Sequence, residues 1–234
     1  MSSSATAAVP REELSEALIS GATYDPVIDD VHAMPLASEQ EILDSLDATL
    51  ARSPAARSLW VFGYGSLMWR PELDYIEKHV GTLAGFSRSF CLWQWRYRGS
   101  RERPGLMLAL DEGVRCDGVL YRLEGAEIRA QLVRLWRREM TGMGYEPRWV
   151  DVESAEGPIR ALTFHANRSG HRYAGRLPLQ TIAAHIATAC GQSGPNASYL
   201  LETWRSCREA GIDDAYVEEL QYLVAGQLRA RQVR

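Results

Sequence analysis

The stretch from Trp60 to Trp69 constrains the fold most, because an apolar run passes directly into closely spaced glycines. The run Leu59–Phe62 predicts a buried strand, and Gly63-Tyr64-Gly65 predicts a tight turn at its end. Glycine lets the backbone come close to a ligand. Successive N–H groups in such a turn can bind an anion or a carbonyl oxygen. A plain strand end would explain the same glycines.

Three common phosphate-binding and nucleophile motifs do not fit this turn. A dinucleotide fingerprint would need a third glycine at position 68, where Met68 stands. No Gly-Lys-Ser or Gly-Lys-Thr follows, as a P-loop requires. The spacing of the serine also differs from that of a G-x-S-x-G elbow.

Residues 126–140 predict the most informative helix, because an acidic residue continues its apolar stripe. At about 100° per residue, Leu132, Leu135 and Trp136 lie on one face, and Glu139 follows them on that face. Burial and the negative end of the helix dipole both disfavour a charged carboxylate there, so we expect a raised pKa for Glu139. A glutamate that closes the helix through an ion pair or an N–H bond is the structural alternative.

The remaining pattern is a series of strands followed by a helical tail, which predicts an α+β fold. We expect one or two strands at 80–95, around Gly85, and further strands at 105–110, 116–123, near 148–153 and at 159–165. A turn at Asp111-Glu112-Gly113 is expected to join the strands at 105–110 and 116–123. We expect helices at 178–190 and 195–210, and a last helix after a cap at Asp213 or Asp214.

Residues 1–57 predict an N-terminal arm, partly disordered, with one helix. Residues 1–10 are small and polar, which is typical of a disordered terminus. Ser38 and Glu41 match a capping box, so we expect a helix at 38–52 that lies on the main domain. We expect residues 58–234 to form the main domain.

Composition narrows the class of function. A net charge of −4 argues against a dedicated nucleic-acid binder. The four cysteines are widely spaced, which favours reduced thiols in a cytoplasmic protein. With neither a run of 18 apolar residues nor a signal-peptide pattern, we expect no membrane association. The aromatic and arginine residues of Trp93–Arg103 could bind nucleic acid without catalysis, or form a solvated loop.

The stretch Phe62–Trp69 resembles the opening signature of the ChaC family, the glutathione-specific γ-glutamylcyclotransferases. Trp136–Met140 with Gly144-Tyr145 is similar to the family segment that carries the catalytic glutamate, which assigns that role to Glu139. Gly194–Leu200 also resembles a family segment. The likeness covers roughly residues 58–230 and implies a γ-glutamylcyclotransferase-like mixed β-barrel with surrounding helices and a helical C-terminal tail.

The resemblance also implies the substrate-binding residues. The N–H groups of the turn are expected to meet the glutamyl carboxylate or carbonyl, and other side chains to recognise the rest of the substrate. The predicted set is Tyr64, Gly65, Ser66, Leu67, Arg70, Tyr145 and Tyr199. The family often has arginine where Leu106 stands, so Arg101 or Arg103 of the neighbouring loop would have to replace it.

The implied reaction converts glutathione to 5-oxoproline and Cys-Gly. The substrate's own α-amino group is the nucleophile, so neither a metal nor another cofactor is expected. We expect a monomeric cytoplasmic lyase acting on a small molecule. A cyclotransferase acting on another γ-glutamyl amine or dipeptide is the alternative within the same fold.

Overall fold

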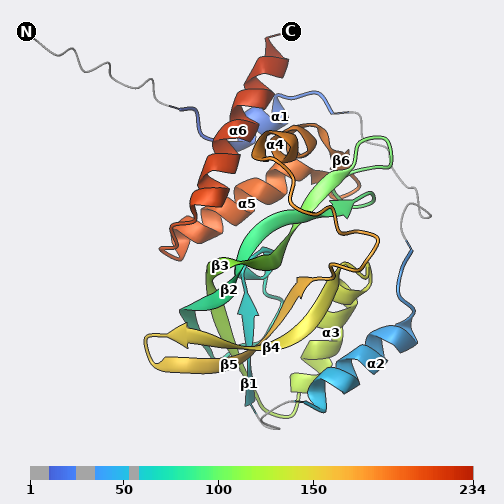
Figure 1. The fold of residues 1–234 in the computed structure, drawn as a ribbon, viewed down its shortest axis with the longest axis vertical. Helices are drawn as coiled ribbons and strands as arrows, with labels where there is room; N and C mark the ends of the chain where they lie inside the picture. Colours follow the sequence, from blue (N-terminus) through green and yellow to red (C-terminus); the bar gives the residue numbers. More distant parts are fainter. Residues whose placement is uncertain (1–10, 25–34, 53–57, 234) are drawn as a thin grey trace, which may run out of the picture.

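In a computed structural model that describes residues 11–24, 35–52 and 58–233, five strands close into a barrel (Figure 1). Neighbouring strands follow the order β1-β3-β2-β4-β5, and β5 returns to pair with β1 in parallel. The predicted α+β barrel is therefore confirmed. The strands are β1 (Ser58–Gly63), β2 (Glu77–Gln94), β3 (Gly105–Glu124), β4 (Tyr145–Ser154) and β5 (Gly157–Ala166), with a separate pair of short strands, β6 (Cys190–Gly191) and β7 (Gly194–Pro195).

The long antiparallel pair β2 and β3 corrects one expectation. The predicted turn at Asp111-Glu112-Gly113 is wrong, because β3 continues through these residues and Asp111 pairs with Ser87 of β2. The register shifts between Ala84 and Phe86, where Gly85 adopts a φ of +81°. A bulge of this kind absorbs extra residues without ending the strand. The glycines that suggested a turn belong to this bulge.

One end of the barrel is covered by a group of four helices (Figure 1). These are α1 (Glu16–Ser20), α4 (Leu179–Thr188), α5 (Asn196–Glu209) and α6 (Ala215–Gln232). The last three helices and the cap of α6 by Asp214 confirm the sequence prediction. Helix α1 was not predicted, and Leu14, Leu18 and Ile19 around it are buried in the same hydrophobic core.

The other side of the barrel is covered by α2 (Glu39–Leu50) and α3 (Ile128–Met140). The capping box predicted at Ser38 is formed, because its side chain accepts from the Glu41 N–H and the Glu41 carboxylate accepts from the Ser38 N–H. The predicted apolar stripe of α3 is buried in a second core around Trp136. This stripe fixes the rotation of α3, and hence the direction of every side chain on it.

The predicted disorder of residues 1–10 lies outside the described residues, and the division of the chain at residue 57 stays a prediction. None of the helices in the described part of the chain combines the length and apolar character needed to cross a bilayer.

We predict that the N-terminal segment contributes to the stability of the main core. Leu14 is 2% exposed, and replacing a buried leucine by alanine typically costs about 2–5 kcal/mol. Leu14→Ala should lower the free energy of unfolding in urea by that amount. Leu36→Ala is the control, because Leu36 is 41% exposed and its loss should change stability by less than about 0.5 kcal/mol. Equal stabilities for Leu14→Ala and the wild type would contradict the packing described.

Candidate active site

The turn after β1 presents backbone N–H groups without partners. The short 3-10 helix η1 (Ser66–Met68) follows Gly65, and its first bond joins the Met68 N–H to the Gly65 carbonyl. In the described part of the chain, the N–H groups of Gly65 and Leu67 donate no hydrogen bond. Burial raises the pKa of the Tyr199 hydroxyl, and a bond from the Ser66 N–H to that hydroxyl opposes the rise. Such a set of aligned N–H groups is an acceptor-binding site for a carboxylate or an oxyanion.

A small cavity of about 20 Å³ lies directly against this turn. It brings together seven of the eight residues predicted for the site and adds two apolar walls. Its lining consists of Tyr64, Gly65, Ser66, Leu67, Leu108, Glu139, Tyr145, Phe164 and Tyr199. The turn, the end of α3 and the start of β4 therefore meet at one point, as the resemblance implied.

Glu139 reaches this cavity because it follows Leu135 and Trp136 by one helical turn on the buried face of α3. Its side chain is only 12% exposed, and its Oε1 atom has no hydrogen-bond partner among the described residues. Burial raises the pKa of the Glu139 carboxyl, opposed by the charge of Arg138. A carboxyl group with a raised pKa and an oxygen that accepts no hydrogen bond can both accept and return a proton.

Arg138 is a site residue that the sequence analysis did not identify. Its Nε atom lies 3.1 Å from Glu139 Oε1, but the geometry is that of an ion pair and not of a hydrogen bond. The same guanidinium donates to the Ser66 hydroxyl at 2.7 Å and pairs with Glu72 at 3.2 Å. It therefore links the end of α3 to the turn that carries the unpaired N–H groups.

The tyrosines of the cavity are held as neutral phenols. Tyr64 donates its hydroxyl to the Phe164 carbonyl at 2.6 Å, and Tyr145 donates to the Leu108 carbonyl at 2.8 Å. Burial raises the pKa values of Tyr64, Tyr145 and Tyr199, and the nearby Glu139 charge raises them further. Fixed neutral rings of this kind give the cavity a rigid wall.

A larger cavity of about 460 Å³ adjoins the small one, and Ser66, Glu139, Tyr145 and Tyr199 line both. Five arginines contribute to its wall. They are Arg70, Arg98, Arg137, Arg138 and Arg172. A cavity of this size with an excess of positive charge suits a small acidic molecule that extends away from Glu139.

Arg172 is the most deeply buried of these arginines, with 4% of its surface exposed. It donates to the Trp93 carbonyl at 2.9 Å and to the Gly142 carbonyl at 3.4 Å, and no carboxylate pairs with it in the described structure. Buried guanidinium groups usually have an anionic partner, because an isolated buried charge is costly. No sequence pattern pointed to Arg172, because it lies between β5 and α4.

The Trp93–Arg103 segment forms part of the wall of the larger cavity. Arg98 lines it and donates to the Pro195 carbonyl at 3.2 Å. The substitutes expected for the arginine missing at Leu106 are not found there, since Arg101 and Arg103 are exposed and do not line the cavity. Leu106 itself is fully buried in β3. The structure thus offers Arg98 and Arg172 in their place.

The predicted site residue outside the small cavity is Arg70. It lines the larger cavity at its rim, where its side chain is 72% exposed and pairs with Glu72 at 2.6 Å. Glu72 adopts a φ of 53°, the left-handed region that residues other than glycine rarely occupy. This backbone conformation places its carboxylate between Arg70 and Arg138.

One group of potential metal ligands occurs away from the cavity. The ligand atoms of Glu77, His79 and Glu156 lie within 4.8 Å of one another. His79 already contacts Glu77 at 2.6 Å, and Arg122 pairs with the same carboxylate. The group is therefore explained by protein contacts.

Comparison with known proteins identifies relatives over most of the chain. The family model described as ChaC-like protein matches residues 59–227. A glutathione-specific gamma-glutamylcyclotransferase of Escherichia coli (strain K12) is 39% identical over 184 residues, covering 78% of this chain and 80% of that protein. Glutathione-specific gamma-glutamylcyclotransferase 1 of Homo sapiens is 35% identical over 150 residues, covering 62% of this chain and 68% of the human protein.

Among solved structures, a yeast gamma-glutamyl cyclotransferase specific to glutathione has a TM-score of 0.68 and 20% identity. The match covers 73% of this chain and 97% of the yeast chain. At this identity the likeness concerns the fold, and it agrees with the barrel and helices described above.

We predict that the buried Glu139 carboxylate destabilises the folded chain at high pH. Because its pKa is raised on folding, its contribution to stability is fully present below the unfolded pKa and is lost as pH rises through the folded pKa. Glu139→Gln cannot lose a proton, so it should gain stability relative to the wild type as pH rises from acid to alkaline.

Glu39→Gln is the matched control with the opposite sign. The hydrogen bond from Arg137 lowers the pKa of the exposed Glu39 carboxyl, so this variant should lose stability relative to the wild type as pH rises. Urea unfolding across the pH range gives both differences. A difference between Glu139→Gln and the wild type that is constant with pH would contradict the raised pKa.

Proposed function

The chain belongs to the ChaC family, and from that premise we propose that it is a glutathione-specific γ-glutamylcyclotransferase that degrades glutathione. The proposed products are 5-oxoproline and Cys-Gly. The observation that carries this proposal is the position of Glu139, whose Oε1 atom accepts no hydrogen bond from any described residue and whose side chain lines the same small cavity as Gly65 and Leu67.

The proposed reaction needs a base and an acid but no nucleophile from the protein. Glu139 takes a proton from the substrate's α-ammonium group, and the freed amine attacks the γ-carbonyl carbon. A C–N bond forms and the carbonyl electrons move to oxygen. The ring nitrogen then releases its second proton to solvent, the carbonyl re-forms, and the bond to the cysteinyl nitrogen breaks. Glu139 returns the proton to that departing nitrogen. General acid–base catalysis of this kind is typically worth about 10²–10⁴-fold.

The unpaired N–H groups of the turn suit the negative oxygen that develops during this attack or the substrate's glutamyl carboxylate. Backbone donors aimed at such a charge need no reorganisation when it forms. Tyr64, Tyr145 and Tyr199 line the small cavity, and the last two also line the larger one. We propose that they keep the glutamyl chain folded where the two cavities meet. Orientation alone contributes roughly 7–11 kcal/mol in well-arranged intramolecular reactions.

The rest of the substrate is proposed to extend into the larger cavity. Glutathione ends in a glycyl carboxylate, and the cavity wall carries the buried Arg172 and the half-buried Arg98. A charged hydrogen bond to either guanidinium would favour the tripeptide over shorter γ-glutamyl amines. The exposed Arg70 at the rim is proposed to make a weaker, solvent-screened contact.

We also propose that the enzyme works as a monomer in the cytoplasm, without a cofactor, and on neither nucleic acid nor a membrane. The four cysteines are buried and unpaired, which is typical of a reducing compartment. Trp93 and Trp95 pack on His185 and His171, which favours a structural use of that segment over base stacking.

Glu139→Gln is the direct test of the proposed base. The amide keeps the shape of the side chain but cannot accept a proton, so release of 5-oxoproline from reduced glutathione should fall at least about a hundredfold. Circular dichroism should show a folded variant. Turnover near that of the wild type would overturn the assignment of Glu139.

Arg172→Met tests recognition of the distal carboxylate. Loss of a charged hydrogen bond worth about 1.5–3 kcal/mol should raise KM for glutathione at least about tenfold. KM for γ-glutamyl-alanine, which lacks the glycyl residue, should change much less. Arg70→Met is the control at the exposed rim, with an expected change below about fivefold. Equal effects of Arg172→Met on both substrates would assign Arg172 a structural role instead.

A further inference from the structure

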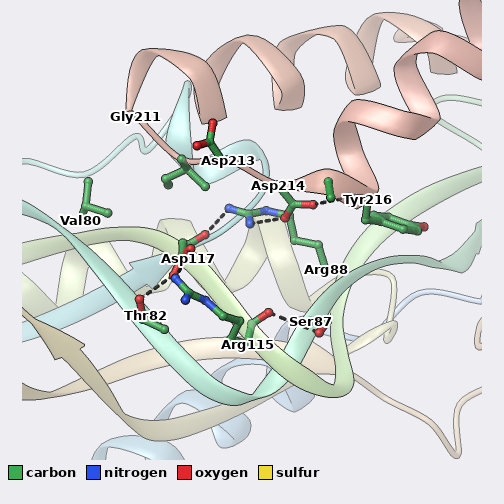
Figure 2. Close-up of a pocket in the computed structure, with 12 residues that line it drawn as sticks. Val80, Thr82, Ser87, Arg88, Arg115, Asp117, Gly211, Asp213, Asp214 and Tyr216 are labelled. Carbon is green, nitrogen blue, oxygen red and sulfur yellow. Dashed lines mark hydrogen bonds and ion pairs between the residues drawn. The ribbon is translucent and has the colours of Figure 1, made fainter.

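A further cavity, of about 680 Å³, lies between β2, β3 and the start of α6, and it shares no lining residue with the two cavities of the candidate active site. Figure 2 shows Arg88 at its inner wall, between Asp214 and Asp117. Arg88 projects from β2 and is only 4% exposed. Its neighbours on the same face of the strand are apolar, so a charged side chain is unusual at this position. A guanidinium at such a position needs a reason, because burying a charge is costly.

The contacts of Arg88 all converge on groups that hold the turn. Its Nη1 atom pairs with Asp214 at 2.7 Å, and its Nη2 atom donates to the Asp117 carbonyl. Its Nε–H donates to the carbonyl oxygen of Tyr64 at 2.7 Å. Nη2 also lies 3.5 Å from the Met68 sulfur, at the end of η1. The side chain therefore contacts both ends of the segment that carries the unpaired N–H groups.

The bond to Tyr64 has a direct consequence for the next residue. The Tyr64 carbonyl and the Gly65 N–H belong to one planar trans peptide, so they point in opposite directions. Arg88 lies outside the small cavity, whereas Gly65 lines it. Fixing the carbonyl toward Arg88 thus turns the Gly65 N–H away from Arg88. The positive charge also polarises this peptide and makes the N–H a stronger donor.

Asp214 anchors this arrangement to the helical end of the molecule. Its Oδ1 atom accepts from the N–H groups of Tyr216 and Val217 at 3.1 Å and caps α6, while Oδ2 receives Arg88. A connected chain of contacts thus runs from the start of α6 through Asp214 and Arg88 to the Tyr64–Gly65 peptide.

We infer that Arg88 is a positioning residue for the cyclotransferase reaction, which it serves by orienting the Tyr64–Gly65 peptide so that the Gly65 N–H faces the substrate. This inference rests on the proposed function for its catalytic consequence, but not for its geometry. Arg88 does not itself line the catalytic cavity, so its effect must pass through the Tyr64 backbone that it contacts.

The sequence offers an unusually clean probe of this peptide. Tyr64-Gly65 is the one Tyr-Gly pair in the whole chain. A sample with ¹³C in tyrosine carbonyls and ¹⁵N in glycines therefore gives a single carbonyl–nitrogen correlation peak in NMR. In Arg88→Lys, which keeps the charge but not the Nε donor, we expect the carbonyl signal to move upfield and the Gly65 N–H signal to shift. Arg115→Lys, on the exposed wall of the same cavity, should leave the peak in place.

The rate of glutathione cyclisation by Arg88→Lys tests the catalytic consequence of the orientation of the Tyr64–Gly65 peptide. Misplacing a group by about 1 Å can cost up to about a hundredfold in rate, so kcat/KM for glutathione should fall at least about tenfold in Arg88→Lys. The pH at which activity is lost on the acid side should not move, because Glu139 keeps its surroundings. Arg115→Lys should remain within about twofold of the wild type.

Asp214→Asn separates positioning from stability. Asparagine still caps α6 but gives up the ion pair, while Arg88 keeps its bonds to the Tyr64 and Asp117 carbonyls. We therefore expect lower stability, with the Tyr64-Gly65 peak and kcat/KM close to the wild type. Equal losses of activity in Asp214→Asn and Arg88→Lys at equal losses of stability would overturn the inference. An unmoved Tyr64-Gly65 peak in Arg88→Lys would do the same.

Two further measurements keep the outcomes distinct. If Arg88→Lys does not fold, the labelled Glu139→Gln chain titrated with glutathione takes its place: the Gly65 N–H signal should shift on binding, and an unmoved signal at saturation would refute the inferred orientation. If wild-type chain releases no 5-oxoproline, the proposed function fails, whereas the response of the NMR peak to Arg88→Lys still decides the geometry.

Discussion

The Glu139 carboxyl group is subject to two opposing effects. Its burial on the apolar face of α3 disfavours the charged form, while the Arg138 guanidinium beside it favours that form. The outcome is a group with a raised pKa and one oxygen without a hydrogen bond, facing backbone N–H groups across a very small space. A proton acceptor and an anion-binding surface at such close quarters suit a reaction in which the substrate attacks itself.

The rest of the fold holds Glu139 and the turn with the unpaired N–H groups in place from opposite sides. The core around Trp136 fixes the rotation of α3 against the barrel and so directs Glu139 into the cavity. The turn that follows β1 is held from the other side by Arg88, whose ion pair with Asp214 ties it to the start of α6. Each face of the barrel thus contributes one half of the site.

Local patterns in the sequence predicted the elements that carry the chemistry, because strand alternation, helical stripes and capping are short-range signals. They failed where a distant partner decides the conformation, as at Asp111, which pairs with Ser87 of β2 beside a β-bulge and does not form a turn. The short helix α1 was missed because its burial depends on α5 and α6. The sequence could not predict the contacts of Arg88, Arg138 and Arg172 for the same reason. Their partners are backbone carbonyls or side chains far along the chain.

The most direct test of the account is the identity of the products formed from reduced glutathione in water enriched in ¹⁸O. Attack by the substrate's own amine consumes no water, so the account predicts equal amounts of Cys-Gly and 5-oxoproline, with no ¹⁸O in the 5-oxoproline. Release of glutamate carrying ¹⁸O would identify a hydrolase instead. Unchanged glutathione would show that the cavity serves another substrate. Either result would contradict the proposed role of Glu139 in glutathione cyclisation.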